Sequence, residues 1–427
     1  MRISNPGRLL SCITVLAAAA SVTAAGAQHH DSTAGISTAF GANANAVATV
    51  VSPAIMGEAL TEGYLTQPFL FAHLALPRNA LALHAMMNFE GITLERGELN
   101  PGIYGEGYVD RRHPHTYLHE LMLATEWNAR LAHLSLAAGK GFAPFGTDDP
   151  MSRPFVKYPV NHHLAQILER VVAVAALRMR YGAVEAGLFN GDEPESSGDA
   201  PNAPRLWDSW AVRGTALPIP GAELQASYAR VRSPEYALGD GLDHRKKSAS
   251  LRYESGPASP RRYALVEWAN TVEYLGGEAT FAFRSVLGEG EVRGRRAAVA
   301  LRIEHTERPD EERLLDPFRT PRPGSDFNLL GRSRWTVVSA RGSLPFELPR
   351  RGRIEPFVEI ARAAVVQTVA PAAFEPKLFY GGDRLWSLSA GIRFGLGARH
   401  GRMGRYGVAI APSRGTISGT AGRDHTH

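Results

Sequence analysis

The chain has 427 residues, a formal net charge of +5 and a single cysteine, Cys12. Its 47 basic and 42 acidic side chains nearly balance and are spread along the sequence, which argues against nucleic-acid binding. One cysteine cannot form a disulfide within the chain or a multi-cysteine metal site.

The N-terminus has the pattern of a secretory signal. Arg2 and Arg8 precede an apolar run from Leu9 to Ala25, and the small residues at 25–27 suit cleavage after Ala27. We therefore expect residues 1–27 to be a signal peptide that removes the cysteine. Residues 28–41 are expected to be a flexible segment.

Most of the remaining chain alternates between apolar and polar residues. In the segment LWSLSAGIRF, every second residue from Trp386 to Phe394 is apolar, and AVALRIEHT and IEPFVEIA follow the same rule. A period of two predicts β-strands with one apolar face. The expected strands are Ala42–Val51, Pro68–Leu76, Ala80–Glu90, Thr116–Glu126, Arg130–Gly139, Glu169–Tyr181, Ala183–Asn190, Asp208–Leu217, Ala222–Arg232, Arg245–Glu254, Arg261–Asn270, Glu278–Leu287, Arg296–Glu307, Arg334–Pro345, Ile354–Val366 and Leu385–Leu396.

The connections between these strands alternate in length. Short turns such as 77–79 and 127–129 are followed by long segments such as 91–115 and 140–168. After the signal, no stretch approaches the about 18 apolar residues of a spanning helix. The pattern predicts an all-β fold: a single transmembrane antiparallel β-barrel of about 16 strands (about 14–18) over residues 42–396, with short periplasmic turns and long extracellular loops.

One alternative remains for the fold, and two remain for the C-terminal tail. A soluble all-β sandwich or propeller is less favoured, because so many strands in one soluble sheet would enclose a hollow barrel. Residues 397–427 form a C-terminal tail that either extends the last strand toward Tyr406 or lies disordered in the periplasm.

Two histidine-rich segments, DRRHPHTYLHE and PVNHHL, lie in successive long loops. If both loops fold inward, their side chains meet and suit a divalent transition metal such as Zn²⁺, Cu²⁺ or Ni²⁺, the only cofactor that the sequence suggests. The candidate ligands are His113, His115, His162, His163, Asp110, Glu120 and His119. Alternatively, these groups form a hydrogen-bond network that orders the loops.

The direction of His119 depends on the strand that carries it. In a regular strand over Thr116–Glu126, His119 shares the lipid-facing side of Leu121 and Leu123, whereas Glu120 faces the lumen. If the strand starts later, a helical turn places His115 and His119 on one face.

Charged residues on the inward parity of the strands are candidates for the pore lining. These residues are Arg178, Arg180, Arg302, Glu304, Glu355, Glu359, Arg393 and His133, the last expected beside Glu120. Their mixed signs give no preference between anions and cations. The alternative is that they pair across a filled lumen.

Part of the chain resembles a known group of proteins. GKGFAPFG and VEAGLFNG look like strand ends of porin-type barrels, and DRRHPH, NHH and FNGDEPE resemble a family of uncharacterised bacterial outer-membrane barrels with D-R-x-H-P-H, T-H-H and F-N-G-x-E-P segments. The resemblance extends from Gln67 to Glu195 and departs at Asn161 and His119. It implies an outer-membrane barrel and carries no activity.

The sequence therefore favours a porin-like barrel of the bacterial outer membrane, with lipid and small hydrophilic solutes or ions as partners. One alternative is a barrel that handles a transition metal, and another is a non-conducting structural or adhesive barrel. A homo-oligomer is compatible with these readings, although no interface pattern indicates it. The chain has no G-x-S-x-G or H-E-x-x-H motif, so we expect no enzyme.

Overall fold

The computed structural model describes residues 35–54, 57–94, 115–147, 150–167, 169–194, 196–256, 260–311, 329–369, 375–400 and 402–409. The predicted signal peptide and residues 410–427 lie outside these ranges. No helix within the described ranges is both long enough and apolar enough to cross a membrane.

The described residues are dominated by strands joined by short helical segments. The strands are β1 (Ser37–Ser52), β2 (Leu60–Ala75), β3 (Ala82–Asn88), β4 (Leu118–Asn128), β5 (Ala132–Gly141), β6 (Arg170–Met179), β7 (Gly182–Phe189), β8 (Ser209–Ala216), β9 (Ala222–Val231), β10 (Asp243–Glu254), β11 (Arg261–Leu275), β12 (Glu278–Arg293), β13 (Ala298–Glu311), β14 (Leu329–Ser343), β15 (Phe346–Leu348), β16 (Gly352–Gln367) and β17 (Arg384–Gly397). The helical segments are η2 (Pro77–Asn79), α2 (Glu90–Thr93), η3 (Pro150–Ser152), α4 (His162–Ala165), η4 (Ala203–Arg205), η5 (Pro349–Arg351), α5 (Pro376–Phe379) and η6 (Gly407–Ala409).

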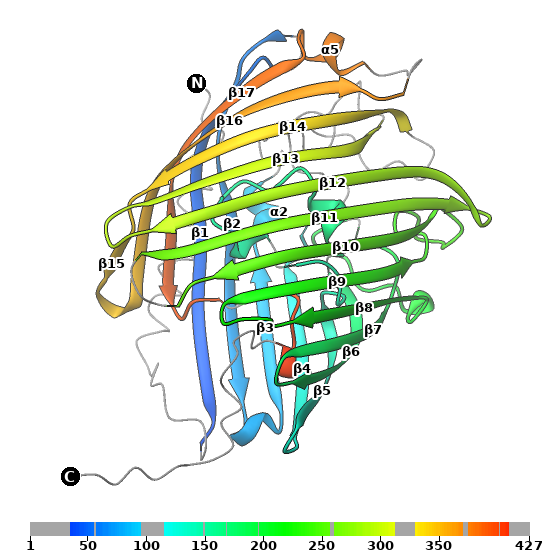
Figure 1. Cartoon of the computed structure of the whole chain (residues 1–427), viewed down its shortest axis with the longest axis vertical. Helices are drawn as coiled ribbons and strands as arrows, with labels where there is room; N and C mark the ends of the chain where they lie inside the picture. The colour runs from blue at the N-terminus through cyan, green and yellow to red at the C-terminus, as the bar shows by residue number, and fades with distance from the viewer. Residues whose placement is uncertain are drawn as a thin grey trace.

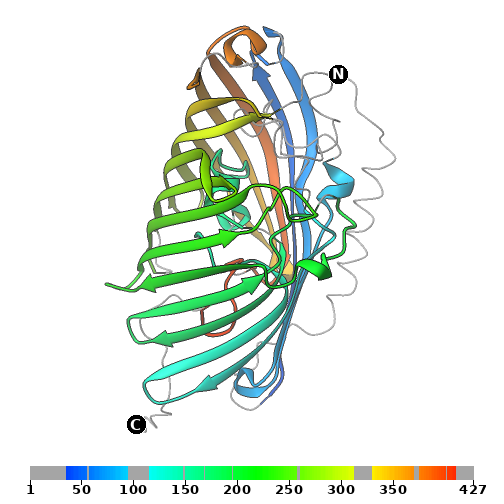
Figure 2. The same cartoon turned by 90° about the vertical axis from the view of Figure 1, so that its right-hand side faces the viewer.

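The strands form one closed antiparallel sheet (Figure 1). The last strand, β17, pairs with β1 from Gly41↔Gly397 to Ser52↔Trp386. The three-residue β15 pairs only with the start of β16, whereas β14 pairs directly with β16. Sixteen strands of the described chain therefore make up the wall, and closure leaves no free sheet edge. Figure 2 shows β1 and β2 on the opposite side of the barrel from the middle strands.

The wall forms because successive side chains of a strand point to opposite faces. In β8 the burial alternates without a break: Arg213 and Thr215 face inward, whereas Trp210 and Val212 are exposed on the outside. The same rule gives the other strands an apolar outer face, as at Leu301 in β13. Each strand thus has one inward, buried face and one outward, exposed face. This arrangement explains both the alternation of residues along the sequence and the two different faces of the barrel wall.

The predicted barrel of about sixteen strands is confirmed, and each predicted segment overlaps one wall strand. Several boundaries differ, most of all that of β2, which begins at Leu60 rather than at Pro68. The first strand begins at Ser37, so residues 37–41 belong to the wall rather than to a flexible segment. On the long-loop side, β11 and β12 are joined by Gly276 and Gly277 alone, whose positive φ angles of 59° and 96° permit a tight hairpin.

The described residues of the long segment 142–169 (142–147, 150–167 and 169) fold into the lumen. Phe155, Val156 and Tyr158 are buried there. The wall holds its backbone: the Val156 amide donates to Glu359 (2.8 Å), and the Val160 amide donates to Glu304 (2.6 Å). Carboxylates of the wall thus hold the backbone of an inward loop.

The C-terminal tail also enters the barrel. The last strand ends at Gly397, and residues 402–409 pack inside with Met403, Tyr406 and Val408 buried. In Figure 1 this segment is the red piece beside β4. The segment neither extends β17 nor lies beyond the barrel, so both sequence-based alternatives are wrong for these residues. Buried hydrogen bonds, which cannot be inferred from strand patterns, decide its position.

Candidate functional site

A β-bulge in β4 turns two adjacent polar residues inward. Along β3 and β4 the register changes from Met86↔Glu120 to Met87↔Leu118, so His119 is an extra residue without an opposite partner. His119 is fully buried and Glu120 is 5% exposed. The expectation that His119 shares the lipid-facing side of Leu121 is wrong, because the extra residue shifts the alternation by one position.

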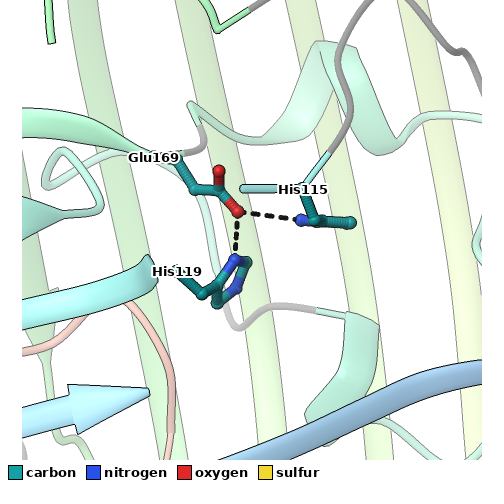
Figure 3. Close-up of side chains that lie close together, drawn as sticks. All are labelled: His115, His119 and Glu169. Atoms are coloured by element: carbon teal, nitrogen blue, oxygen red, sulfur yellow. Dashed lines mark hydrogen bonds and ion pairs between the residues drawn. The ribbon is translucent and has the colours of Figure 1, made fainter. Parts of the chain in front are cut away.

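The bulge brings His119 to a buried cluster with His115 and Glu169 (Figure 3). His115 Nδ1 lies 3.1 Å from Glu169 Oε1, and His119 Nδ1 contacts the same oxygen. One ligand atom from each residue lies within 4.8 Å of the others, and all three side chains are buried. His115 precedes β4 and Glu169 precedes β6, so the cluster joins two loop ends to the wall.

Hydrogen bonds hold Glu169 in an unusual backbone conformation, with φ of 26°. Its Oε2 accepts hydrogen bonds of 2.9 Å from both the amide and the hydroxyl of Thr116. Burial alone would raise the pKa of Glu169, but the adjacent imidazoles of His119 and His115 outweigh burial and hold this pKa well below its ordinary value. Glu169 is therefore an anion at neutral pH. Positive φ in a non-glycine residue costs about 1–3 kcal/mol, which these contacts offset.

A second buried carboxylate faces the other side of His115. His115 Nε2 lies 3.6 Å from Glu90 Oε2. Glu90 is fixed in turn because its Oε1 accepts from the Thr66 hydroxyl (3.0 Å) and the Gln67 amide (2.7 Å). The imidazole of His115 is therefore held between two anchored carboxylates.

The two histidine-rich segments meet through His115 and His162. The rings of His115 and His162 lie 6.4 Å apart, and the Tyr158 ring contacts both, at 6.0 Å and 4.7 Å. His162 thus packs beside the cluster. His163 belongs to α4, whereas His113 and Asp110 lie outside the described residues.

Glu120, another predicted ligand, contacts the C-terminal tail. It shares a hydrogen bond with the hydroxyl of Tyr406 in the tail, and the same hydroxyl accepts from the Phe142 amide (2.9 Å). Burial, and then the charge of Glu120, raise the pKa of Tyr406 well above its ordinary value. Glu120 therefore anchors the tail.

Sequence reasoning missed Glu90, Glu169 and Tyr158 as members of the site. Glu90 ends one predicted strand and Glu169 begins another, both on the long-loop side. The available signal was a carboxylate at a strand end on the long-loop side, because all strand ends on that side surround the same opening of the barrel. Tyr158, in the middle of a long loop, gave no signal.

Most of the predicted pore-lining residues face the interior. Arg302 donates to Glu289 (2.9 Å) and to the Lys157 carbonyl (2.9 Å) in the inward loop. Glu304 and Glu359 bind the same loop, and Arg178 donates to the Val408 carbonyl of the tail (3.5 Å). These charges therefore hold the backbone of segments that lie inside the lumen. Glu355 and Arg393 instead line a cavity near the short-turn end.

Two predicted lining residues lie elsewhere. Arg180 is exposed in the turn after β6, with its guanidinium 5.1 Å from the centre of the Tyr181 ring. The strand ends before Arg180, so the inward parity of Arg178 does not extend to it. His133 pairs with Asn128 at the far end of β4 and β5 from Glu120, so these two residues are not neighbours.

The tail is held mainly by its arginines. Arg405 donates to Gln225 (2.7 Å) and lies 3.6 Å from Glu185, while Arg402 binds Glu223 (2.5 Å). Arg213 of β8 donates to the Gly404 carbonyl (2.6 Å). Residues 402–409 therefore form an ordered part of the lumen.

No family model and no curated protein matches the chain. Among solved structures, OmpT, an outer membrane protein of Vibrio cholerae, is 11% identical, with a TM-score of 0.48, and the match covers 84% of this chain and 97% of that one. An anion-selective porin from Comamonas acidovorans is 9% identical, with a TM-score of 0.48 and coverage of 84% and 100%. OccK2 (OpdF) of Pseudomonas aeruginosa, solved with glucuronate, is 10% identical, with a TM-score of 0.38 and coverage of 85% and 98%. At this level of similarity, nothing about function follows from these proteins.

Proposed function

We propose that the chain is a porin-like barrel of the bacterial outer membrane that passes small hydrophilic solutes or ions. The observation that carries this proposal is the division of the closed wall into an apolar outer face and a charged inner face. Leu123, Leu301 and Leu388 are exposed outside, whereas Arg213, Arg302 and Glu359 are buried inside. A closed barrel satisfies every wall backbone group in lipid, and its apolar outer face replaces water by lipid.

The contents of the lumen limit the size of the solute. The inward loop 142–169 and the tail segment 402–409 both occupy the interior, and a cavity of about 320 Å³ remains at the short-turn end. By the usual topology of such barrels, short turns face the periplasm. Passage through this barrel is therefore slow and limited to small solutes, unlike passage through a wide aqueous pore.

Conductance of the purified protein in planar bilayers tests this function. We expect small, discrete channels in potassium chloride, together with uptake of small sugars in a liposome-swelling assay. A correctly folded barrel that gives neither conductance nor uptake would refute the proposal and favour the structural or adhesive alternative. Heat-dependent gel migration checks that the barrel is folded.

A second candidate function is the binding of a divalent transition metal at His115, His119 and Glu169. Two imidazoles and a carboxylate are typical donors for Zn²⁺ and related ions. The Nδ1 atoms of His115 and His119 both approach the same oxygen of Glu169, so the three donor atoms converge on one point in a buried setting. The donors present thus fit a metal that they would hold at the entrance to the lumen.

Metal analysis tests this second function. After equilibration with zinc and dialysis, the detergent-purified, untagged protein should retain stoichiometric zinc, and His119→Ala and Glu169→Gln should not. His305→Ala is the matched control, because His305 is exposed on the outside of β13. If the wild type retains no more zinc than His119→Ala, the cluster does not bind zinc and only holds the two loop ends together.

A further inference from the structure

We infer that the cavity at the short-turn end of the lumen is a binding site for small anions, including short-chain carboxylates. This inference rests on the proposed passage of solutes and names their class. The cavity, of about 320 Å³, lies between β1, β2, β10–β12, β16 and β17 and is completed by the chain that follows β17. This volume is at the lower end of the about 300–1,000 Å³ typical of small-molecule sites.

The charges that line the cavity are predominantly positive. Four lining residues are carboxylates: Glu254, Glu291, Glu347 and Glu355. Seven are arginines: Arg153, Arg252, Arg261, Arg293, Arg353, Arg393 and Arg399. A cleft with an excess of one charge in low-dielectric walls concentrates ions of the opposite sign.

Each of the four lining carboxylates is already engaged by an arginine. The pairs within the lining are Arg252–Glu254 (2.6 Å), Arg293–Glu291 (2.8 Å), Arg293–Glu355 (3.0 Å) and Arg399–Glu347 (2.6 Å). Glu355 also pairs with Arg341 at 3.0 Å. The acidic groups of the cavity are therefore neutralised from within the protein. Arg153 is paired with Glu267 outside the lining (3.2 Å), so the surplus charge lies on Arg261, Arg353 and Arg393.

Arg353 and Arg393 carry much of this surplus. Arg353 donates to the carbonyls of Gly397 (3.1 Å) and Ala398 (3.4 Å). Arg393 donates to the side-chain oxygen of Asn45 (3.2 Å) and to the Pro154 carbonyl (3.2 Å). Neither guanidinium is in an ion pair within the described chain, although the charges of Glu355 and Glu359 act on Arg393 and that of Glu347 acts on Arg353 from a longer distance. Neutral oxygens thus make the direct contacts of both groups, which leaves them suited to an anionic ligand.

Gly395 provides the space for Arg353. Residues 353 and 395 are opposite each other in the β16–β17 register. A Cβ atom at Gly395 would lie only 2.8 Å from the Arg353 Nη2 atom, so a larger residue would displace the guanidinium. Phe69, Phe71 and Tyr263 add aromatic surface to the lining. Arginines beside aromatic rings suit a carboxylate that has a short hydrocarbon body.

Reversal potentials in a potassium chloride gradient test the inference. Wild-type channels should prefer chloride to potassium, and the double variant Arg353→Gln/Arg393→Gln should lower the chloride-to-potassium permeability ratio about threefold or more, since ring charges tune selectivity. Arg353→Lys/Arg393→Lys, which keeps both charges, should retain the preference. Arg362→Gln is the matched control, because Arg362 lies on the exposed face of the same strand, β16.

Inhibition by an organic anion provides an independent measurement. Added potassium succinate should reduce the chloride current of the wild type more than that of the folded glutamine double variant. Wild-type channels that conduct without preferring anions, or a double variant with unchanged selectivity and succinate inhibition, would overturn the inference and leave the proposed passage intact. A folded wild type that does not conduct would instead refute the proposed function, and with it this inference.

Discussion

The two ends of the lumen handle buried charge in opposite ways. At the long-loop end, the imidazoles of His115 and His119 meet Glu169 in a cluster whose carboxylate side chain is only 2% exposed. At the short-turn end, the carboxylate of Glu355 is 12% exposed and is bracketed by Arg293 and Arg341. The first end holds matched charges with little space between them, and the second holds surplus arginines around a cavity. A buried charge that is matched fixes structure, whereas one that remains unmatched beside a cavity is available for a ligand.

The largest expected effect comes from removing the tail, which occupies part of the lumen and contributes Met403 to the cavity. A chain that ends at Gly397 loses the buried segment 402–409 and its contacts with Glu185 and Glu223. Since the segment fills part of the lumen, we expect single-channel conductance to rise about twofold or more. Planar-bilayer recordings of the folded truncated protein measure this change. Unchanged conductance would mean that solutes do not pass the region that the tail occupies.

Glutamine substitutions at the two ends should differ in their cost to stability. Glu169→Gln leaves His115 and His119 without their shared anion in a dry site, so we expect a loss of about 3–5 kcal/mol in the free energy of unfolding. Glu355→Gln should cost less, about 1–2 kcal/mol, because Arg293 keeps Glu291 (2.8 Å) and Arg341 keeps Glu359 (3.3 Å) as partners. Urea unfolding in detergent measures both losses. Equal losses would remove the proposed contrast between the two ends.

Acid should weaken the histidine end through Glu169. Because its folded-state pKa is depressed, the stabilisation from its charge is fully present above the unfolded-state carboxyl pKa of about 4.3 and is lost as the pH falls from there through the folded-state pKa. The difference in unfolding free energy between the wild type and Glu169→Gln should therefore not fall between neutral pH and about pH 5. Below about pH 4.3 it should shrink by at most about 1.4 kcal/mol per pH unit. A difference that already falls between pH 7 and 5 would contradict the lowered pKa.

The smallest expected effect concerns Gly395. The variant Gly395→Ala keeps every charge but places a Cβ atom against the guanidinium of Arg353. We expect a decrease of about twofold or less in the chloride-to-potassium permeability ratio, with normal stability, because one positive charge moves rather than disappears. Reversal potentials measure it, and Gly342→Ala is the control because a Cβ atom at Gly342 meets nothing within 4 Å. A decrease equal to that of the glutamine double variant would show that position, rather than charge, controls selectivity.

The strands of the wall could be predicted from the sequence because the alternation of inward and outward side chains is a local property of each strand. Each strand buries one face, so the alternation from Trp386 to Phe394 is visible without knowledge of any partner strand. Loop lengths, also local, indicated which strand ends share a mouth. The same reasoning correctly identified Arg302, Glu304 and Glu359 as inward-facing, because their strands are regular.

Only the tertiary structure decided the contents of the barrel. The bulge at His119 depends on the register between β3 and β4, and one extra residue reverses the face of its neighbours. His115 and Glu169 are 54 positions apart in sequence, and Arg405 meets Gln225 from 180 positions away. Contacts between residues so far apart produce no periodic pattern in the sequence. Sequence patterns record which side of a strand is buried, whereas the partner of a buried charge is set by the folding of distant segments into one lumen.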